Sequence, residues 1–203
     1  MVTAKEIYEA LKTVKLIDLN KTRKDTEKLN KRKNRKTKHK ALNMTRDNVS
    51  SLRGKKISGI FGKIANPTSN WKPVDSKLTR TYPKVHKLLF KYIKENAPKG
   101  FKFDSITINH NLKCKKHVDR KNAPVSFITA VGDFTGGELV IEDPKTKKTT
   151  TYVTKNKFLM YDGKTWRHWN NKINGDKYTV VAYNRHGKDR HEKKETFEPY
   201  YVK

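Results

Sequence analysis

A histidine and an aspartate stand two residues apart, at His117 and Asp119, within the segment CKKHVDRKN. Side chains at positions i and i+2 of a strand point to the same side, so both of them can reach one bound ion. Imidazole nitrogens and carboxylate oxygens are common ligands of first-row metal ions. The H-x-D pair alone is a weak signal because it occurs often by chance. A metal site therefore requires a further ligand from elsewhere in the chain.

His168 is the candidate for that third ligand, since it lies in its own predicted strand beyond an interval rich in hairpins. Two histidines and one carboxylate form the ligand set of non-haem Fe(II) oxygenases, which leaves three coordination positions open. Two other interpretations remain. In the first, the H-x-D pair lies at the surface and His168 is an ordinary histidine of the sheet. In the second, the three residues form a cupin-type metal site without oxygenase activity.

A cation and a hydroxyl, Lys177 and Thr179, lie on one face of the last predicted strand. Together they can hold the far carboxylate of a dicarboxylate whose other end chelates the metal, through charge-assisted hydrogen bonds. Asn109 and Asn111 alternate along the strand that precedes the H-x-D pair and share one face as well. One of them hydrogen-bonds the co-substrate or the substrate, or both belong to a polar outer face.

Two tryptophans flank the third candidate ligand, at Trp166 and Trp169. They either wall the pocket and stack on a planar substrate or pack in the core. Arg167, between them, is either a substrate contact or a surface charge. Lys116 and Arg120 alternate with the H-x-D pair, so we expect them to point away from the metal and to contact an anionic substrate at the rim of the pocket.

Hydrophobic periodicity places these residues on a mainly β core. Residues 4–17 have the helical spacing of an amphipathic helix, with Thr3 as N-cap and Glu6 three residues later. Residues 82–96 have one apolar face and Pro83 in the first turn. From residue 101 the period changes to two, and seven or eight short strands follow with tight turns. A helical, basic first half followed by many short strands is typical of a β-sandwich or a jelly roll.

The net charge of +28, from 48 Lys and Arg against 20 Asp and Glu, favours a polyanionic partner, with nucleic acid ahead of an anionic membrane surface or an acidic protein. Residues 21–41 hold eleven of the basic residues and two acids, which predicts a basic arm, and residues 113–121 predict a basic rim around the metal pair. The alternatives are a solvated tail and a general lysine bias.

The order H-V-D, G-D-F-T-G-G-E-L, Y-D-G…W-R-H-W and N-G-D-K-Y-T-V-V-A-Y resembles the Fe(II)/2-oxoglutarate-dependent dioxygenase superfamily over residues 82–184. The resemblance implies a double-stranded β-helix, the cupin-like jelly roll, with N-terminal helices packed outside it. It implies His117, Asp119 and His168 as iron ligands and Lys177, with Thr179, as the 2-oxoglutarate anchor. It also implies that O2 is consumed and 2-oxoglutarate becomes succinate while a substrate C–H bond is hydroxylated.

The charge favours a nucleobase hydroxylase that is similar to the ten-eleven-translocation and J-binding-protein oxygenases, acting on a flipped or single-stranded base in DNA or RNA. One departure favours another branch, because the nucleic-acid branches usually carry arginine at the position of Lys177. Lysine there, with the G-G-E turn, resembles the prolyl hydroxylases, so a protein hydroxylase is the alternative. A nucleic-acid-binding protein with an inactive oxygenase-like core is a second alternative, which the intact set of ligand types argues against.

We expect a basic N-terminal helix and arm in residues 1–50, the oxygenase domain in 51–184 and a polar C-terminal tail in 185–203. The single cysteine, Cys114, allows no intrachain disulfide and favours a reducing compartment. No apolar run is long enough to span a bilayer, and the first twenty residues lack the apolar core of a signal peptide. These features predict an intracellular protein, cytoplasmic or nuclear, without membrane association.

Overall fold

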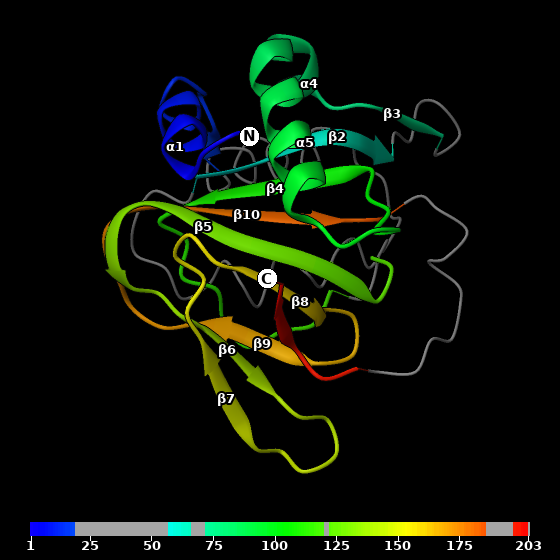
Figure 1. The fold of residues 1–203 in the computed structure, drawn as a ribbon, viewed down its shortest axis with the longest axis vertical. Helices are drawn as coiled ribbons and strands as arrows, with labels where there is room; N and C mark the ends of the chain where they lie inside the picture. Colours follow the sequence, from blue (N-terminus) through cyan, green and yellow to red (C-terminus); the bar gives the residue numbers. More distant parts are fainter. Residues whose placement is uncertain (19–56, 66–71, 120–121, 186–196, 203) are drawn as a thin grey trace, which may run out of the picture.

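A computed structural model describes residues 1–18, 57–65, 72–119, 122–185 and 197–202 of the chain (Figure 1). The predicted basic arm at 21–41 lies outside the described residues, and so does Arg120. None of the helices in the described residues has both the length and the apolar character needed to cross a membrane.

The described residues form three helices on one side of the molecule: α1 (Ala4–Lys12), α4 (Lys77–Thr81) and α5 (Pro83–Asn96). The predicted capping box of α1 is present, since the Glu6 amide donates to Thr3 Oγ1 and the Thr3 amide donates to the Glu6 carboxylate. This helix ends at Lys12, earlier than the predicted residue 17, because the Thr13 amide and hydroxyl both turn back to the Ala10 carbonyl.

Among the described residues, the larger sheet has eight strands in the order β1-β2-β4-β10-β5-β8-β11, with β3 joined to β2. Their bounds are β1 (Ile17–Asp18), β2 (Ile57–Ala65), β3 (Pro73–Asp75), β4 (Ser105–His110), β5 (Val125–Gly136), β8 (Phe158–Asp162), β10 (Ile173–Tyr183) and β11 (Tyr200–Val202). All of the pairings in this sheet are antiparallel. The segment SGIFGKIAN contributes most of β2.

The smaller sheet contains β6 (Leu139–Glu142), β7 (Thr149–Tyr152) and β9 (Arg167–Asn170), in the order β7-β6-β9. An isolated antiparallel bridge between His117 and His168 adds the segment around residue 117 beside β9. The chain therefore passes between the two sheets, through β4, the segment at 117, β5, β6, β7, β8, β9 and β10 in turn. This connectivity is a double-stranded β-helix, or jelly roll, and the predicted fold class is confirmed.

The alternation of side chains along β5 and β10 divides the core into two layers. Phe127, Val131 and Val180 pack toward the helices, where the larger cluster of buried residues lies. Ile128 belongs to the second cluster, which lies between the two sheets, and Val181 packs against that cluster. Residues 177 and 179 have the same parity as Val181, so β10 presents them to the interior of the jelly roll.

Both ends of the described chain pack on this core. Helix α1 buries Ile7 and Leu11 in the larger cluster, and β11 pairs with β8 through Tyr200 and Met160. The sequence predicted a polar tail after residue 184, whereas its last described residues extend the larger sheet. The proposed boundaries at residues 50 and 184 stay a prediction.

Candidate metal centre

His117 and His168 lie directly opposite each other on the smaller sheet. The His117 amide donates to the His168 carbonyl at 3.0 Å, and the His168 amide donates to the His117 carbonyl at 2.9 Å. A pair that exchanges both backbone hydrogen bonds places its side chains on the same face of a sheet. Their ring centroids are accordingly 4.3 Å apart, although many residues separate them in sequence.

The outer nitrogen of each ring is already fixed by the backbone. His117 Nδ1 lies 2.7 Å from the Lys115 carbonyl, and His168 Nδ1 lies 3.0 Å from the Trp166 carbonyl. A carbonyl only accepts, so Nδ1 carries the proton and donates in both rings. This leaves the Nε2 lone pair of each ring available as a metal ligand, the arrangement that orients histidine at metal sites.

Asp119 faces both of these nitrogens. Its Oδ1 lies 3.7 Å from His117 Nε2, and its Oδ2 lies 3.8 Å from His168 Nε2. The Asp119 amide donates to the Gly163 carbonyl at 2.7 Å, which fixes the backbone next to the carboxylate. One ligand atom from each of the three residues lies within 4.8 Å of the others, so the donor set fits one metal ion.

The environment keeps His168 in the form that a metal requires. The side chain is buried, and this burial lowers the pKa of the imidazole, against the opposing effect of the Asp119 carboxylate. Tyr161, fully buried, packs its ring edge-on against His168 at 5.1 Å. A neutral imidazole held by a fixed wall is suited to bind a cation through Nε2.

Lys177 lies on the inner face of β10, as its parity requires, and is 3% exposed. Its Nζ donates to the Gly137 carbonyl, and within the described residues it has no carboxylate partner. Burial lowers its pKa to about 8. An ammonium group has three donors, so two of them are free for an anionic ligand.

Thr179 and Asn109 lie beside Lys177 on the same inner face. Thr179 pairs with Asn109 across β10 and β4, so the two side chains are adjacent. Asn109 Oδ1 accepts from Ser58 Oγ at 2.7 Å, which leaves its Nδ2 as the group that can donate to a ligand. The structure therefore brings together Lys177, Thr179 and Asn109 of the predicted co-substrate residues.

Asn111 departs from the predicted alternation. Its φ of 48° takes it out of the strand, so it does not share a strand face with Asn109. Its Oδ1 accepts from the Lys177 amide at 2.7 Å, and its Nδ2 lies 3.3 Å from His110 Nε2. The side chain is thus engaged with the protein and not directed at the inner face.

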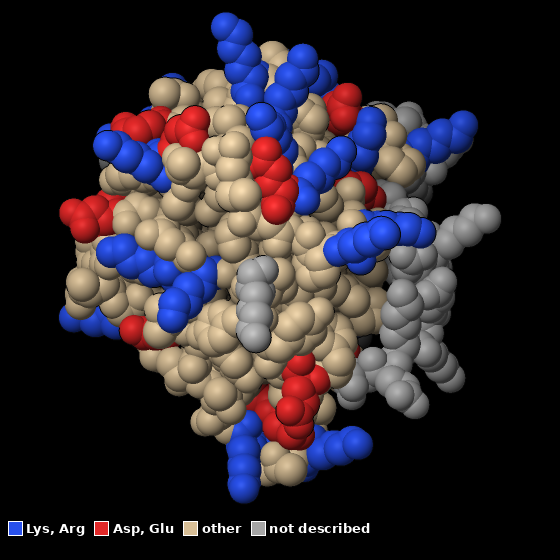
Figure 2. All heavy atoms as spheres, viewed as in Figure 1, with Lys and Arg blue, Asp and Glu red and all other residues tan. Residues whose placement is uncertain are grey.

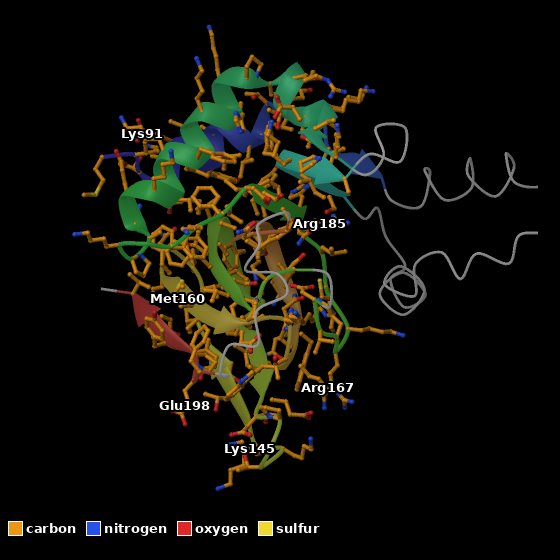
Figure 3. The ribbon with its side chains drawn as sticks, turned by 90° about the vertical axis from the view of Figure 1, so that its right-hand side faces the viewer. Lys91, Lys145, Met160, Arg167, Arg185 and Glu198 are labelled. Carbon is orange, nitrogen blue, oxygen red and sulfur yellow. The ribbon has the colours of Figure 1, made fainter. Side chains whose placement is uncertain are left out.

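The predicted substrate residues divide between the two faces of β9. Trp166 lies in the cluster between the sheets, and its Nε1 has no hydrogen-bond partner among the described residues. Arg167 and Trp169 alternate with His168 and lie on the outer face, where Lys116 Nζ lies 5.1 Å from the centre of the Trp169 ring. Figure 3 shows Arg167 directed outward at the edge of the molecule.

Glu142 joins this outer group by pairing with Lys116 and by lying 4.0 Å from Arg167. Lys116, Arg167 and Trp169 therefore meet each other on the outside of the smaller sheet, not in the pocket.

Two glycines that the sequence did not single out as site residues lie against two of the candidate side chains, Asp119 and Lys177. A Cβ at Gly163 would lie 2.9 Å from Ser126 Oγ and 3.3 Å from Asp119 Oδ2. A Cβ at Gly137 would lie 3.0 Å from Lys177 Nζ, and its φ is +67°. The G-G and D-G turns were the available signals, but a turn alone does not reveal which side chain lies against it.

No family model and no curated protein matches the chain. Among solved structures, a prolyl hydroxylase from Trichoplax adhaerens, in complex with a hypoxia inducible factor peptide fragment, is similar at 12% identity and TM-score 0.42, over 69% of this chain and 67% of that chain. A Pseudomonas putida prolyl-4-hydroxylase is similar at 12% identity and TM-score 0.41, over 68% and 76%. NgTET1 in complex with 5mC DNA is similar at 14% identity and TM-score 0.43, over 65% of this chain and 62% of that chain. All three TM-scores lie below 0.5 and all three identities below 25%.

Proposed function

We propose that the chain is an Fe(II)- and 2-oxoglutarate-dependent dioxygenase that acts as a hydroxylase. The observation that carries the proposal is the joint placement of two kinds of group inside one jelly roll. His117, Asp119 and His168 converge with their ligand atoms within 4.8 Å, and Lys177 is buried on an inner face without a carboxylate partner among the described residues. Such a set fits a metal ion and a dicarboxylate chelated to it.

In this proposal each side chain has a separate task. His117, Asp119 and His168 hold the iron and leave positions open to the co-substrate and O2. Bound iron supplies the O2 activation that couples conversion of 2-oxoglutarate to succinate with hydroxylation of a C–H bond. Lys177 binds the far carboxylate of the co-substrate, and the Thr179 hydroxyl and the Asn109 amide orient it. Tyr161 and Trp166, packed between the sheets, exclude water from the inner end of the site.

The metal site is tested first, because every later step depends on it. We expect His117→Ala and Asp119→Ala to weaken binding of Mn(II), a non-oxidising substitute for Fe(II), by more than about 100-fold. Loss of a residue that only hydrogen-bonds a metal ligand already weakens metal affinity by about 10- to 100-fold, and loss of the ligand itself should cost more. Isothermal titration of the purified protein measures this. His86→Ala, a histidine on α5 outside the site, is the matched control. Wild-type protein that binds neither Mn(II) nor Fe(II), or forms no succinate from 2-oxoglutarate, contradicts the proposal.

For the substrate we propose a nucleobase, or its methyl group, in DNA or RNA. The net charge of +28 supports a polyanion, and exposed lysines lie both beside the metal pair, at residues 113, 115 and 116, and along α5. Lys84, Lys87, Lys91 and Lys94 recur at helical spacing on the exposed side of that helix. Figure 2 shows Lys and Arg side chains gathered over this helical end. The base has to be flipped or single-stranded to reach the inner face.

Hydroxylation of a protein side chain is the alternative. It is supported by the lysine at position 177, because the nucleic-acid branches of the dioxygenase superfamily that this sequence resembles usually have arginine there. Mass spectrometry after incubation with Fe(II), ascorbate and 2-oxoglutarate separates the two. A gain of one oxygen in nucleosides from DNA or RNA supports the first function. The same gain confined to peptides supports the second. Metal binding with no oxidised product in either pool, in a protein that binds DNA or RNA, supports a nucleic-acid-binding protein with an inactive oxygenase-like core.

A further inference from the structure

Strand β4 ends at His110, and Asn111 follows it with a φ of 48°, in the left-handed region that asparagine tolerates better than most residues. Asn111 is exposed, so replacing its side chain would leave no cavity. If β4 continued for one more residue, Asn111 would pair with Lys177, because the register already pairs His110 with Tyr178.

Asn111 still makes two hydrogen bonds to the backbone of Lys177, but one of them uses a side-chain oxygen in place of the backbone carbonyl oxygen. The Asn111 amide donates to the Lys177 carbonyl at 2.9 Å, as it would in a regular ladder. The return bond, from the Lys177 amide, goes to Asn111 Oδ1 at 2.7 Å instead of to the backbone carbonyl. The side chain thus replaces the carbonyl that the left-handed turn takes away, and both backbone groups of Lys177 are held on this side.

The amide of Asn111 is itself oriented by its surroundings. Because Oδ1 accepts from Lys177, Nδ2 faces the group formed by His110 and Asp176, where it lies 3.3 Å from His110 Nε2. The Asp176 carboxylate is bonded to His110 and accepts from the Tyr8 hydroxyl of α1 at 2.8 Å. Asn111 therefore lies between a fixed network that includes the outer helix and the backbone of the inward-facing lysine.

We propose that Asn111 is a positioning residue for co-substrate binding, which acts by holding the backbone of Lys177 so that its side chain stays directed at the inner face. This inference rests on the proposed role of Lys177 as the 2-oxoglutarate anchor. It assigns Asn111 no contact with the co-substrate, since both ends of its amide face the protein.

The test compares two asparagines that share a left-handed backbone. Asn111→Gly keeps the turn and removes the side-chain amide, both the Oδ1 acceptor and the Nδ2 contact with His110. Asn156→Gly makes the same change at a φ of 54°, where no side-chain hydrogen bond is found among the described residues. Two quantities are measured on the full chain: hydrogen exchange at the Lys177 amide without ligands, and 2-oxoglutarate affinity in the presence of Mn(II). We expect Asn111→Gly alone to speed the exchange and to weaken 2-oxoglutarate binding by about fivefold, the loss of one hydrogen bond, with Mn(II) affinity unchanged.

The other outcomes count against the positioning role or against the proposed function. Unchanged exchange at Lys177 means that Oδ1 does not hold the strand. Faster exchange with unchanged 2-oxoglutarate affinity means that the bond is structural only, which overturns the positioning role. An equal effect of Asn156→Gly assigns the change to glycine flexibility and overturns it too. Wild-type protein that binds Mn(II) but no 2-oxoglutarate contradicts the proposed function, whatever the exchange shows.

Discussion

Lys177 carries a buried charge that forms no ion pair within the described residues, although the Glu138 carboxylate partly offsets the effect of burial on its pKa. Its lowered pKa, about 8, means that burial of the ammonium lowers the free energy of unfolding at neutral pH. The cost is fully present below pH 8 and disappears as the pH rises toward the unfolded value near 10.4. At about 1.4 kcal/mol per pKa unit, it amounts to about 3 kcal/mol at most.

Replacing this lysine should therefore separate stability from function. We expect Lys177→Met to raise the free energy of unfolding at pH 7 by about 1 to 3 kcal/mol and to abolish measurable 2-oxoglutarate binding, because the buried charge is lost together with the anchor. Urea unfolding at pH 7 and pH 10 checks the first part, and the gain should shrink at pH 10. Lys148→Met, at an exposed position, is the control. A variant less stable than wild type at pH 7 would contradict this.

The same pKa predicts how co-substrate affinity depends on pH. Only the protonated amine attracts a carboxylate, so 2-oxoglutarate affinity should be constant below about pH 8 and fall by up to tenfold per unit above it. Titrations with Mn(II) present, from pH 6.5 to 9.5, measure this. Affinity that stays constant up to pH 9.5 would show that another group binds the far carboxylate.

Period-two alternation predicted that Lys177 and Thr179 share a strand face, whereas the grouping of His168 with His117 and Asp119 came from the ligand set and from the resemblance to the oxygenases. It did not predict the roles of Asn111 or Gly137. Both depend on a left-handed backbone, which in the case of Asn111 breaks the alternation. Whether a strand ends at its last apolar residue or one residue later is decided by tertiary pairing, and a single sequence carries little information about that pairing.

The turn after β8 lies against Asp119, one of the three candidate metal ligands. We expect Gly163→Ala to weaken Mn(II) affinity by about tenfold, because the new methyl group would lie 2.9 Å from Ser126 Oγ and 3.3 Å from Asp119 Oδ2 and would displace the carboxylate. Metal titration measures the loss, and circular dichroism verifies the fold. Lys164→Ala, the next residue of the same turn, should bind Mn(II) as wild type does. Equal affinities in both variants would mean that Asp119 tolerates the displacement.

Strand positions were the most predictable elements, and the C-terminal end of the described chain was the least. The apolar and β-branched runs of β5, β8 and β10 identify buried strands by composition alone. Strand β11 has two exposed tyrosines in three residues and follows a long polar segment, so nothing local distinguishes it from a tail. It becomes a strand because the edge of β8 offers unpaired backbone groups, which is a property of the fold and not of the segment.

Exposed cations lie at both ends of the molecule, and Figure 3 places Lys91 at the helical end and Lys145 at the opposite tip, in the β6–β7 hairpin. If the helical end binds nucleic acid, its lysines should contribute to the salt dependence of binding and those of the hairpin should not. Each phosphate contact contributes about 0.9 to the slope of log affinity against log salt for duplex DNA.

We expect Lys84, Lys87 and Lys94, all changed to glutamine, to lower this slope by about 2 to 3, whereas the same change at Lys145, Lys147 and Lys148 should lower it by less than about 1. Fluorescence anisotropy with a labelled DNA duplex, at several salt concentrations, gives the slopes. The two triple variants lose equal charge, so equal slopes would assign the binding to net charge and not to α5. Affinity that does not depend on salt would contradict the nucleic-acid partner.

The direct backbone pairing of His117 with His168 has a consequence for the choice of metal. Two of the three candidate ligands are fixed by hydrogen bonds of the sheet itself, so we expect a protein stripped by a chelator to stay folded and to reload without refolding. Metal binding then adds only the stabilisation that follows from the concentration and affinity of the metal ion.

A preformed site of two nitrogens and one carboxylate also obeys the general order of divalent affinities, in which copper, nickel and zinc exceed iron. The metal found in a purified sample should therefore depend on which ion was supplied, and zinc or copper should inhibit by occupying the place of iron.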